Sequence, residues 1–442
     1  MIPAMNPVFG DLHDGGAIAE IFSERAFIDR CLRFERYLAE AQAELGMIPE
    51  DAAEEIQRAA RIENIDLDAL RKKTRTVGLP IVGLVDQVVR LCRADLGQHV
   101  HYGATTQDTM DCALALQMRE ALVLVDTALN RISAALDDLA VANRHAIQAG
   151  RTNQQHALPI TFGFKAAVWN AGVRRQIDRL AQIRQRAATG QLGGAVGTLA
   201  SFSGTGHELR RRLMRKLALS EPGIAWHSMR DGPVECVMLL AQIAATLGKI
   251  GRDLLMLSST EVGEIAFSAE RGASSTMPQK SNPVAASSVV ALARMVFHAS
   301  PMVLDASLVE NERSLDAWYV ELHAVPLCFS LTGALLGQTL NMLDELRVDT
   351  RKMASNALIT GGAITSETAQ MVLAKHIGLN RAHALVSKAC SKARADGTSV
   401  VEELIGLDTG VDEETLRSSL DVSGHMEFGL REVEASRRQF LW

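Results

Sequence analysis

The stretch VECVMLLAQIAATLGKIGRDLLML, residues 234–257, decides the fold class of this chain. Apolar residues recur along it at alternating spacings of three and four, a pattern typical of a helix that buries one seam against other helices. The residues of this seam are Leu240, Ile243, Leu247, Ile250, Leu254 and Leu257. Such a helix must be packed along its whole length, so the chain is predicted to be an all-α protein.

Carboxylates replace the apolar residues where the seam reaches Glu261 and Glu264. Two interpretations stay open. Either the helix end emerges into solvent, or these carboxylates stand at the rim of a polar site.

Other segments share the length and low proline content of this helix. The long segments cover residues 108–148, 163–189, 233–267, 284–310 and 318–346. These lengths far exceed the mean helix and predict a bundle of parallel or antiparallel rods. Shorter amphipathic helices are expected before the first long segment and after Gly361 and Gly362. We therefore predict three helical domains, residues 1–98, 99–346 (the long-helix bundle) and 347–442.

Composition and charge limit the partners of the chain. Its 442 residues include 11 prolines and only 4% aromatics, which argues against a β-sandwich or barrel. A formal net charge of -6 shows no basic surplus, so neither nucleic acid nor an anionic membrane is an expected partner. No segment is predicted to span a membrane, because Lys249, Arg252 and Asp253 interrupt the most apolar helix.

The cysteines and the first residues indicate the compartment. Six cysteines are scattered without a CxxC pair, in a chain too large to need disulfides. The opening MIPAMNPVFGDLHDGG, residues 1–16, lacks the basic and apolar regions of a signal peptide. A reduced, cytoplasmic compartment is therefore expected.

Several common catalytic motifs are absent from the sequence. There is no HExxH and no Cys/His cluster at metal-ligand spacing, so no metal site is expected. There is no GxxxxGK[ST] and no GxSxG, and Gly193, Gly194 and Gly197 lack the spacing of a dinucleotide fingerprint. No cofactor is expected.

Three polar segments remain, each at or between the ends of long helices. The first is HYGATTQD, residues 101–108, before a helix expected to begin at about Asp108. Thr105, Thr106 and Gln107 can donate hydrogen bonds beside the positive end of the helix dipole, which suits a carboxylate. Alternatively, Thr106 or Asp108 is only an N-cap and His101 a surface loop residue.

The second polar segment is GRTNQQHALPITFG, residues 150–163, between two long helices. His156 is its candidate for proton transfer, because the reference pKa of histidine, about 6.5, lies close to working pH. A lone histidine near a helix end is also commonly structural, and that interpretation stays open.

The third polar segment is GASSTMPQKSNP, residues 272–283. Its first residues form a flexible stretch rich in backbone N–H groups, and Lys280 and Asn282 lie six and eight residues after Ser274. A loop can fold these groups around one anion. The alternative, a solvated linker between helices, is weakened by Met277 and Pro278.

In this order and at these separations, the three segments resemble the signature regions of the fumarase/aspartase superfamily of homotetrameric lyases. The resemblance covers nearly the whole chain, and SSTMPQKSNP, residues 274–283, matches the superfamily signature SSxMPxKxNP closely. Within it, the chain looks most like the 3-carboxy-cis,cis-muconate cycloisomerases of the adenylosuccinate lyase/cycloisomerase subgroup. Besides HYGATTQD, the stretches that carry this likeness are residues 21–49, 155–169, 191–202, 247–264 and 311–318.

The resemblance implies an enzyme that acts on a carbon acid beside a carboxylate, in a homotetramer whose long helices form a common core with shared active sites. The implied reaction lactonises 3-carboxy-cis,cis-muconate, a small polycarboxylate of protocatechuate degradation, to 4-carboxymuconolactone through an aci-carboxylate. The implied catalytic residues are Ser274, His156 and Lys280. The implied substrate-binding residues are His101, Thr105, Thr106, Gln107, Arg151, Thr152, Gln155, Ser275, Met277, Asn282 and Arg313.

Departures from the subgroup bear on the substrate. Gln279 and Ser281 stand where the subgroup's loops commonly have histidine and arginine, and Asn311 replaces the histidine of a HER segment. A positive charge near the substrate is therefore missing. A C–N lyase that releases fumarate from adenylosuccinate or an N-substituted aspartate stays open, although residues 76–90 lack the His-Asp pair usual in adenylosuccinate lyases. An inactive structural relative is the third alternative.

Overall fold

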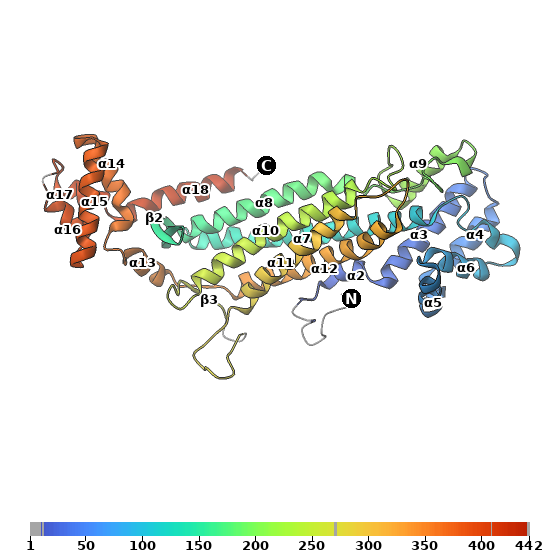
Figure 1. Ribbon diagram of the computed structural model, residues 1–442, viewed down its shortest axis with the longest axis horizontal. Coiled ribbons are helices and arrows are strands. Elements are labelled where there is room, and N and C mark those ends of the chain that lie inside the picture. Colours follow the sequence, from blue (N-terminus) through green and yellow to red (C-terminus); the bar gives the residue numbers. More distant parts are fainter. Residues whose placement is uncertain (1–9, 11–12, 269–271, 408, 440–442) are drawn as a thin grey trace. The chain divides into compact units, whose positions relative to one another are not determined.

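The computed structural model describes residues 10, 13–268, 272–407 and 409–439 (Figure 1). Most of these residues are helical, and the sheets among them are two small antiparallel pairs, β1–β2 and β3–β4. The prediction of an all-α protein is confirmed. Most of the opening stretch used to judge a signal peptide lies outside the described residues.

The long helices lie close to the segments predicted from the sequence, and Figure 1 draws each as a continuous rod. They are α7 (Thr106–Ala142), α8 (Phe162–Ala187), α10 (Asp231–Leu257), α11 (Val284–Asp305) and α12 (Leu315–Glu345). The main difference is at α10, which was expected to continue to residue 267. Ser258, Ser259 and Thr260 follow its last apolar turn. The backbone N–H of Gly263, which has φ +57°, donates to the Ser259 carbonyl at 2.7 Å in a separate turn, and the helix ends at Leu257.

That early end decides between the two interpretations of the carboxylates beyond α10. Glu264 is fully buried, while Glu261 is exposed. The prediction that the chain emerges into solvent is therefore correct for Glu261 and wrong for Glu264.

Shorter helices fill the chain on both sides of the long ones. Before α7 they are α2 (Gly16–Ile21), α3 (Glu24–Ala43), α4 (Glu50–Ala59), η2 (Ile62–Asn64), α5 (Leu67–Val77), α6 (Ile81–Leu91) and η3 (Ala94–His99). Between α8 and α10 lie η4 (Ala200–Phe202) and α9 (Gly206–Leu217). After α12 they are α13 (Thr350–Leu358), η5 (Ala363–Thr365), α14 (Ser366–Ile377), α15 (Leu379–Asp396), α16 (Val400–Ile405), α17 (Glu413–Ser419), η6 (Val422–His425) and α18 (Met426–Gln439).

A β-hairpin replaces the irregular connection expected between α7 and α8. Strand β1 (Ile147–Thr152) pairs antiparallel with β2 (Gln155–Thr161), and Thr152 lies opposite Gln155. The two residues between them, Asn153 and Gln154, have φ of +48° and +65°. This is the left-handed conformation that a two-residue hairpin loop requires. A second, smaller pair joins β3 (Ile265–Ala266) to β4 (Arg347–Val348).

The chain divides into two compact units. One comprises Met1–Leu129, Gln176–Gly248 and Ser288–Gly337, and the other comprises Asn130–Arg175, Lys249–Ser287 and Gln338–Trp442. The first has its core between the N-terminal helices and the start of α7, with Leu32, Leu84 and Met110 buried in it. In the second, Leu373, Val386 and Leu404 are buried between α14, α15 and α16. The three-domain division remains a prediction.

Three helices are long and apolar enough to cross a membrane by length and composition alone, namely α10, α11 and α12. The prediction that no segment qualifies was wrong on that criterion. Lys249, Arg252 and Asp253 fall in the last turns of α10, so they leave its earlier part nearly free of charge. Only about half of each apolar window, between 44% and 56%, is buried inside the chain.

Candidate functional site

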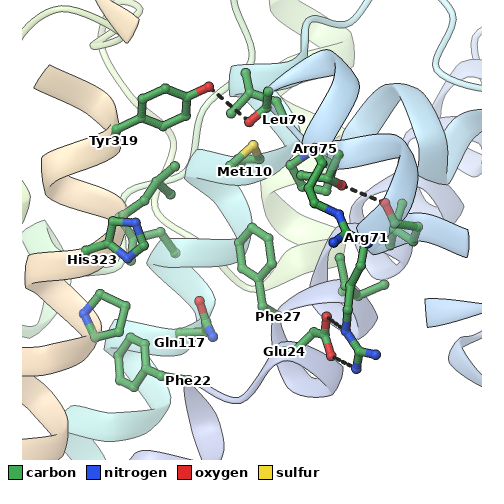
Figure 2. A pocket seen from close by; sticks show the side chains of 18 residues that line it. Phe22, Glu24, Phe27, Arg71, Arg75, Leu79, Met110, Gln117, Tyr319 and His323 are labelled. Carbon is green, nitrogen blue, oxygen red and sulfur yellow. Dashed lines mark hydrogen bonds and ion pairs between the residues drawn. The ribbon is translucent and has the colours of Figure 1, made fainter. Parts of the chain in front are cut away.

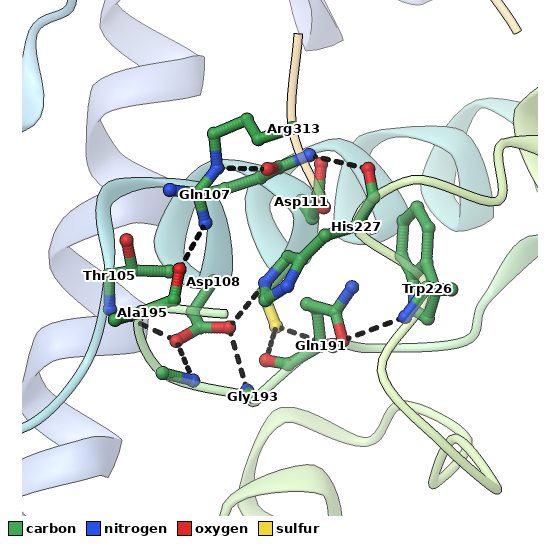
Figure 3. A network of polar contacts seen from close by, with 12 residues as sticks. Thr105, Gln107, Asp108, Asp111, Gln191, Gly193, Ala195, Trp226, His227 and Arg313 are labelled. Carbon is green, nitrogen blue, oxygen red and sulfur yellow. Dashed lines mark hydrogen bonds and ion pairs between the residues drawn. The ribbon is translucent and has the colours of Figure 1, made fainter. Parts of the chain in front are cut away.

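Asp108 organises the first polar segment (Figure 3). Its fully buried carboxylate accepts the backbone N–H of Thr105 at 3.0 Å and those of Gly193 and Gly194 at 2.8 and 3.0 Å. His227 Nε2 lies 2.9 Å from the same group. Helix α7 begins at Thr106, so Thr105 is the residue before it. The Asp108 carboxylate accepts the Thr105 N–H as the acidic residue of a capping box does. Thr105 is therefore the N-cap residue, not Thr106 or Asp108, and Asp108 caps the helix from its third position.

Gln107 and Arg313 meet beside this carboxylate. The Gln107 side chain is buried; its Nε2 donates to the His227 carbonyl at 2.9 Å, and its Oε1 accepts from Arg313 Nε at 2.6 Å. Arg313 also donates to the Ala195 carbonyl at 3.2 Å. Both ends of the Gln107 amide therefore have protein partners. The structure brings these two predicted residues together, and their role in binding remains a prediction.

The other predicted residues of this segment are partly buried. Thr105 and Thr106 stand at the start of α7. His101 has φ +59°, and its Nδ1 lies 2.8 Å from the buried carboxylate of Glu35 on α3. Thr109 donates its hydroxyl to the same carboxylate oxygen at 3.0 Å.

A buried ion cluster lies one helical turn further along α7. Arg230 donates to both carboxylate oxygens of Asp111 at 2.9 Å and to Glu321 at 2.9 Å, and all three side chains are almost fully buried. Burial lowers the pKa of Arg230, but the charges of Asp111 and Glu321 raise it, and the net direction is upward. Sequence reasoning missed this cluster, along with His227 and Glu35.

A signal for one of these residues was present in the sequence. Glu35 lies three residues after Leu32 and three before Leu38, so it occupies a position on the apolar face of an amphipathic helix. A carboxylate there must be buried and needs a partner. His227 and Arg230 follow an irregular segment and carry no comparable signal.

The second polar segment forms the tip of the β1–β2 hairpin. Arg151 lies opposite His156 in the ladder, and Thr152 opposite Gln155, so the four predicted residues share one tip. Arg151 makes two hydrogen bonds with Glu264, one of them 3.1 Å long. The Glu264 carboxylate also accepts hydrogen bonds from the side-chain amides of Gln148 at 2.7 Å and Asn356 at 2.9 Å.

These contacts mean that the Arg151 guanidinium neutralises a buried carboxylate. They also set the environment of His156. Burial of the ring, followed by the charge of Arg151, lowers the pKa of His156 below its usual value, while Glu264 opposes the shift. The imidazole is therefore largely neutral at neutral pH and can accept a proton. Its Nδ1 is buried and has no hydrogen-bond partner in the described part of the chain.

The third polar segment is a loop closed at its neck. Asn282 donates its backbone N–H and its side-chain amide to the Gly272 carbonyl at 2.9 and 3.0 Å, and Ala273 bridges Ser281. Inside the loop, Ser274 Oγ accepts backbone N–H groups from Met277 at 3.1 Å and Thr276 at 3.4 Å.

The remaining predicted residues of this loop, Ser275, Met277 and Lys280, are exposed. The Lys280 backbone N–H donates to the Met277 carbonyl at 3.0 Å, and its side chain makes no hydrogen bond or ion pair with the described residues. A loop that directs N–H groups at one serine oxygen and exposes a lysine is suited to bind an anion and to stabilise negative charge on that oxygen.

The predicted residues fall into two sets. His101, Thr105, Thr106, Gln107 and Arg313 belong to the first unit. Arg151, Thr152, Gln155, His156, Ser274, Ser275, Met277, Lys280 and Asn282 belong to the second.

A cavity of about 720 Å³ in the first unit is lined by none of these residues (Figure 2). Its walls are mainly apolar and include Phe22, Phe27 and Met110. At its edge Arg71 pairs with Glu24 through bonds of 2.8 and 2.5 Å. Arg75 and His323 also line the cavity, and no lining residue belongs to the three polar segments.

Comparison with known proteins identifies the class. A family model described as lyase matches residues 14–297. The chain therefore belongs to this lyase family of the fumarase/aspartase superfamily and is an enzyme of that type. The superfamily resemblance inferred from the three polar segments is confirmed.

Relatives with the same sequence identity to this chain are named for different reactions. The chain is 38% identical over 399 residues to a 3-carboxy-cis,cis-muconate cycloisomerase of Acinetobacter baylyi, covering 89% of this chain and 88% of the relative. It is 38% identical over 404 residues to a nitrosuccinate lyase of Streptomyces davaonensis, covering 88% and 85%. The solved β-carboxy-cis,cis-muconate cycloisomerase of Acinetobacter calcoaceticus sp. ADP1 matches with a TM-score of 0.91 and 33% identity, over 98% of this chain and 100% of that one.

Proposed function

We propose that the chain is a 3-carboxy-cis,cis-muconate cycloisomerase that forms 4-carboxymuconolactone. The observation that carries the chemistry is the pair of backbone N–H groups donated to Ser274 Oγ. Such donors stabilise an alkoxide, which an isolated serine could not form at neutral pH. The cycloisomerase relatives support the choice of substrate.

Proton transfer to carbon is the step assigned to Ser274. A carboxylate oxygen of the substrate adds to the β carbon of the conjugated double bond, and the electron pair moves into the neighbouring carboxylate as an aci-carboxylate. Ser274 gives its hydroxyl proton to the α carbon and becomes an alkoxide, which solvent then reprotonates. In reverse, the alkoxide takes the α proton and the C–O bond breaks. Lys280 and Asn282 hold the charged carboxylate.

A C–N lyase is the second candidate, since a nitrosuccinate lyase is as similar to the chain as a cycloisomerase. Ultraviolet assays run side by side with 3-carboxy-cis,cis-muconate, adenylosuccinate, N-substituted aspartates and nitrosuccinate decide between them. Turnover of the muconate at a kcat/KM at least about 100-fold above the others supports the proposal. No turnover of the muconate, with turnover of any other substrate, would contradict it.

The effect of His156→Ala depends on the leaving group. A departing carboxylate needs no proton, because its pKa is near 4, whereas a departing amine does. We expect kcat to fall about 10²- to 10⁴-fold on an amine substrate and about 10-fold or less on the lactone reaction. Steady-state kinetics of the variant on every substrate that the wild type converts measure this. Equal losses on both kinds of substrate would remove His156 from the protonation of the leaving group.

We also propose a homotetramer with shared sites. Large apolar side chains remain exposed along and after α11, including Phe297 at 40%, Leu304 at 52% and Leu308 at 76%. Exposed apolar surface of this extent is typical of an interface.

Complementation between impaired variants tests sharing directly. Differently tagged Ser274→Ala and His156→Ala chains are co-expressed, and oligomers carrying both tags are purified. If one site takes Ser274 and His156 from different copies, about a quarter of the sites regain both residues, and the activity per site rises above that of either variant alone. The substrate is one on which both single substitutions lower kcat measurably. Mixed oligomers no more active than the mean of the two single variants would contradict shared sites.

A further inference from the structure

Glu35 is a buried carboxylate on α3 that the proposed chemistry does not use. Its side chain is 1% exposed, and its Oε1 lies 2.8 Å from His101 Nδ1 and 3.0 Å from the Thr109 hydroxyl. The second oxygen, Oε2, is buried and has no hydrogen-bond partner in the described part of the chain. A buried carboxylate with one unpartnered oxygen is costly unless a positive charge lies beside it.

His101 can supply that positive charge. Two charged groups act on its ring, Glu35 from α3 and Asp108 from α7. Burial of the ring lowers the pKa of His101, but the charge and hydrogen bond of Glu35, followed by the charge of Asp108, raise it, and the net direction is upward. Asp108 already accepts three backbone N–H groups and has His227 Nε2 at 2.9 Å. Glu35 is therefore the main partner of His101.

The pairing leaves one ring nitrogen available. Nδ1 is used by Glu35, whereas Nε2 makes no hydrogen bond to the described residues, and the His101 side chain is 17% exposed. A charged imidazole held in this way offers one N–H to a ligand. The ring lies at the start of the segment that also carries Thr105 and Thr106.

We propose that Glu35 is a positioning residue that holds His101 as a positively charged hydrogen-bond donor for a carboxylate of the substrate. The inference rests on the proposed function, because it requires a polycarboxylate substrate. A polycarboxylate carries several negative charges, and a protonated His101 supplies one positive charge to balance them.

The test compares Glu35→Gln with Glu55→Gln. Glu55 is a second buried glutamate of the N-terminal helices, and its partners are Arg58 and Arg93 rather than any predicted site residue. In Glu35→Gln we expect KM for the converted substrate to rise about 10-fold with kcat changed less than about threefold. Glu55→Gln should keep the wild-type KM even if it lowers stability.

The pH profile gives a readout that general destabilisation does not move. Binding requires protonated His101, so kcat/KM falls as the pH rises through its raised pKa. Removal of the Glu35 charge lowers that pKa, and the alkaline fall of kcat/KM should begin at lower pH in Glu35→Gln but not in Glu55→Gln. Equal profiles in the two variants, or a loss confined to kcat, would overturn the proposal.

Two further measurements remain informative if the first variant does not fold or the substrate differs. His101→Gln keeps a neutral donor, and we expect its KM to rise and the alkaline fall assigned to His101 to disappear. Histidine NMR titrations of the wild type and of Glu35→Gln, with His101→Gln to assign the resonance, report the pKa without any substrate. An unchanged His101 pKa in Glu35→Gln refutes the pairing even where the proposed reaction is correct. A lowered pKa with no turnover of any polycarboxylate refutes the proposed function instead.

Discussion

Replacement of Ser274 by alanine is expected to lower kcat at least about 1000-fold while leaving the fold intact. The hydroxyl is the proton donor and acceptor at carbon in the proposed reaction, and the N–H groups of Met277 and Thr276 lose the oxygen they stabilise. Stopped or continuous ultraviolet assays measure the rate, and circular dichroism checks the helices.

Ser287→Ala is the matched control for this prediction. Ser287 is an exposed serine in the first turn of α11, after the loop has closed, and it is not one of the predicted site residues. We expect its kcat to stay within about threefold of the wild type, as for most surface substitutions. A Ser274→Ala enzyme as active as Ser287→Ala would show that the loop does not carry the chemistry.

Arg230→Met is expected to cause the largest loss of stability. The substitution leaves Asp111 and Glu321 buried without their shared cation, and removal of one partner from a buried ion pair costs about 3–5 kcal/mol. Denaturant unfolding followed by circular dichroism measures the change. The triple variant Arg230→Met, Asp111→Asn, Glu321→Gln should recover part of the loss, because it also removes the negative charges.

Arg71→Met provides the comparison for a solvent-exposed pair. Arg71 binds Glu24 with a side chain that is 52% exposed, so its loss should change stability by no more than about 1 kcal/mol. Similar effects of Arg71→Met and Arg230→Met would mean that the buried cluster is not under the strong electrostatic constraint inferred here.

Much of the fold could be predicted because the position of each helix depends mainly on the residues within that helix. Apolar spacing and scarce proline located the starts of the long helices within about three residues, while the predicted ends of α7, α10 and α11 lie beyond the observed ones. The β1–β2 hairpin was missed because its turn, Asn153-Gln154, adopts the left-handed conformation without the glycine that normally announces it. Membrane-compatible hydropathy was missed because charged residues gather at one end of α10.

The three polar segments of the candidate site could be located from the sequence, but the residues that they contact could not. Segments 101–108, 150–163 and 272–283 stand out as polar runs between apolar helices. Their partners Glu35, Glu264 and Arg313 lie far away in the sequence, and chain folding alone brings them to His101, Arg151 and Gln107. Periodicity specifies which face of a helix is buried but not which distant residue it meets.

The closed neck of the third segment bears on how such enzymes diversify. Gly272 has φ +85°, and a methyl group on it would approach the Asn282 carbonyl oxygen to 2.1 Å, so the two ends of the loop depend on each other. Residues between these ends can be exchanged without disturbing the helix that follows. Substitutions at Gln279 and Ser281 can therefore change the substrate preference while the loop and its proton-transfer residue are kept.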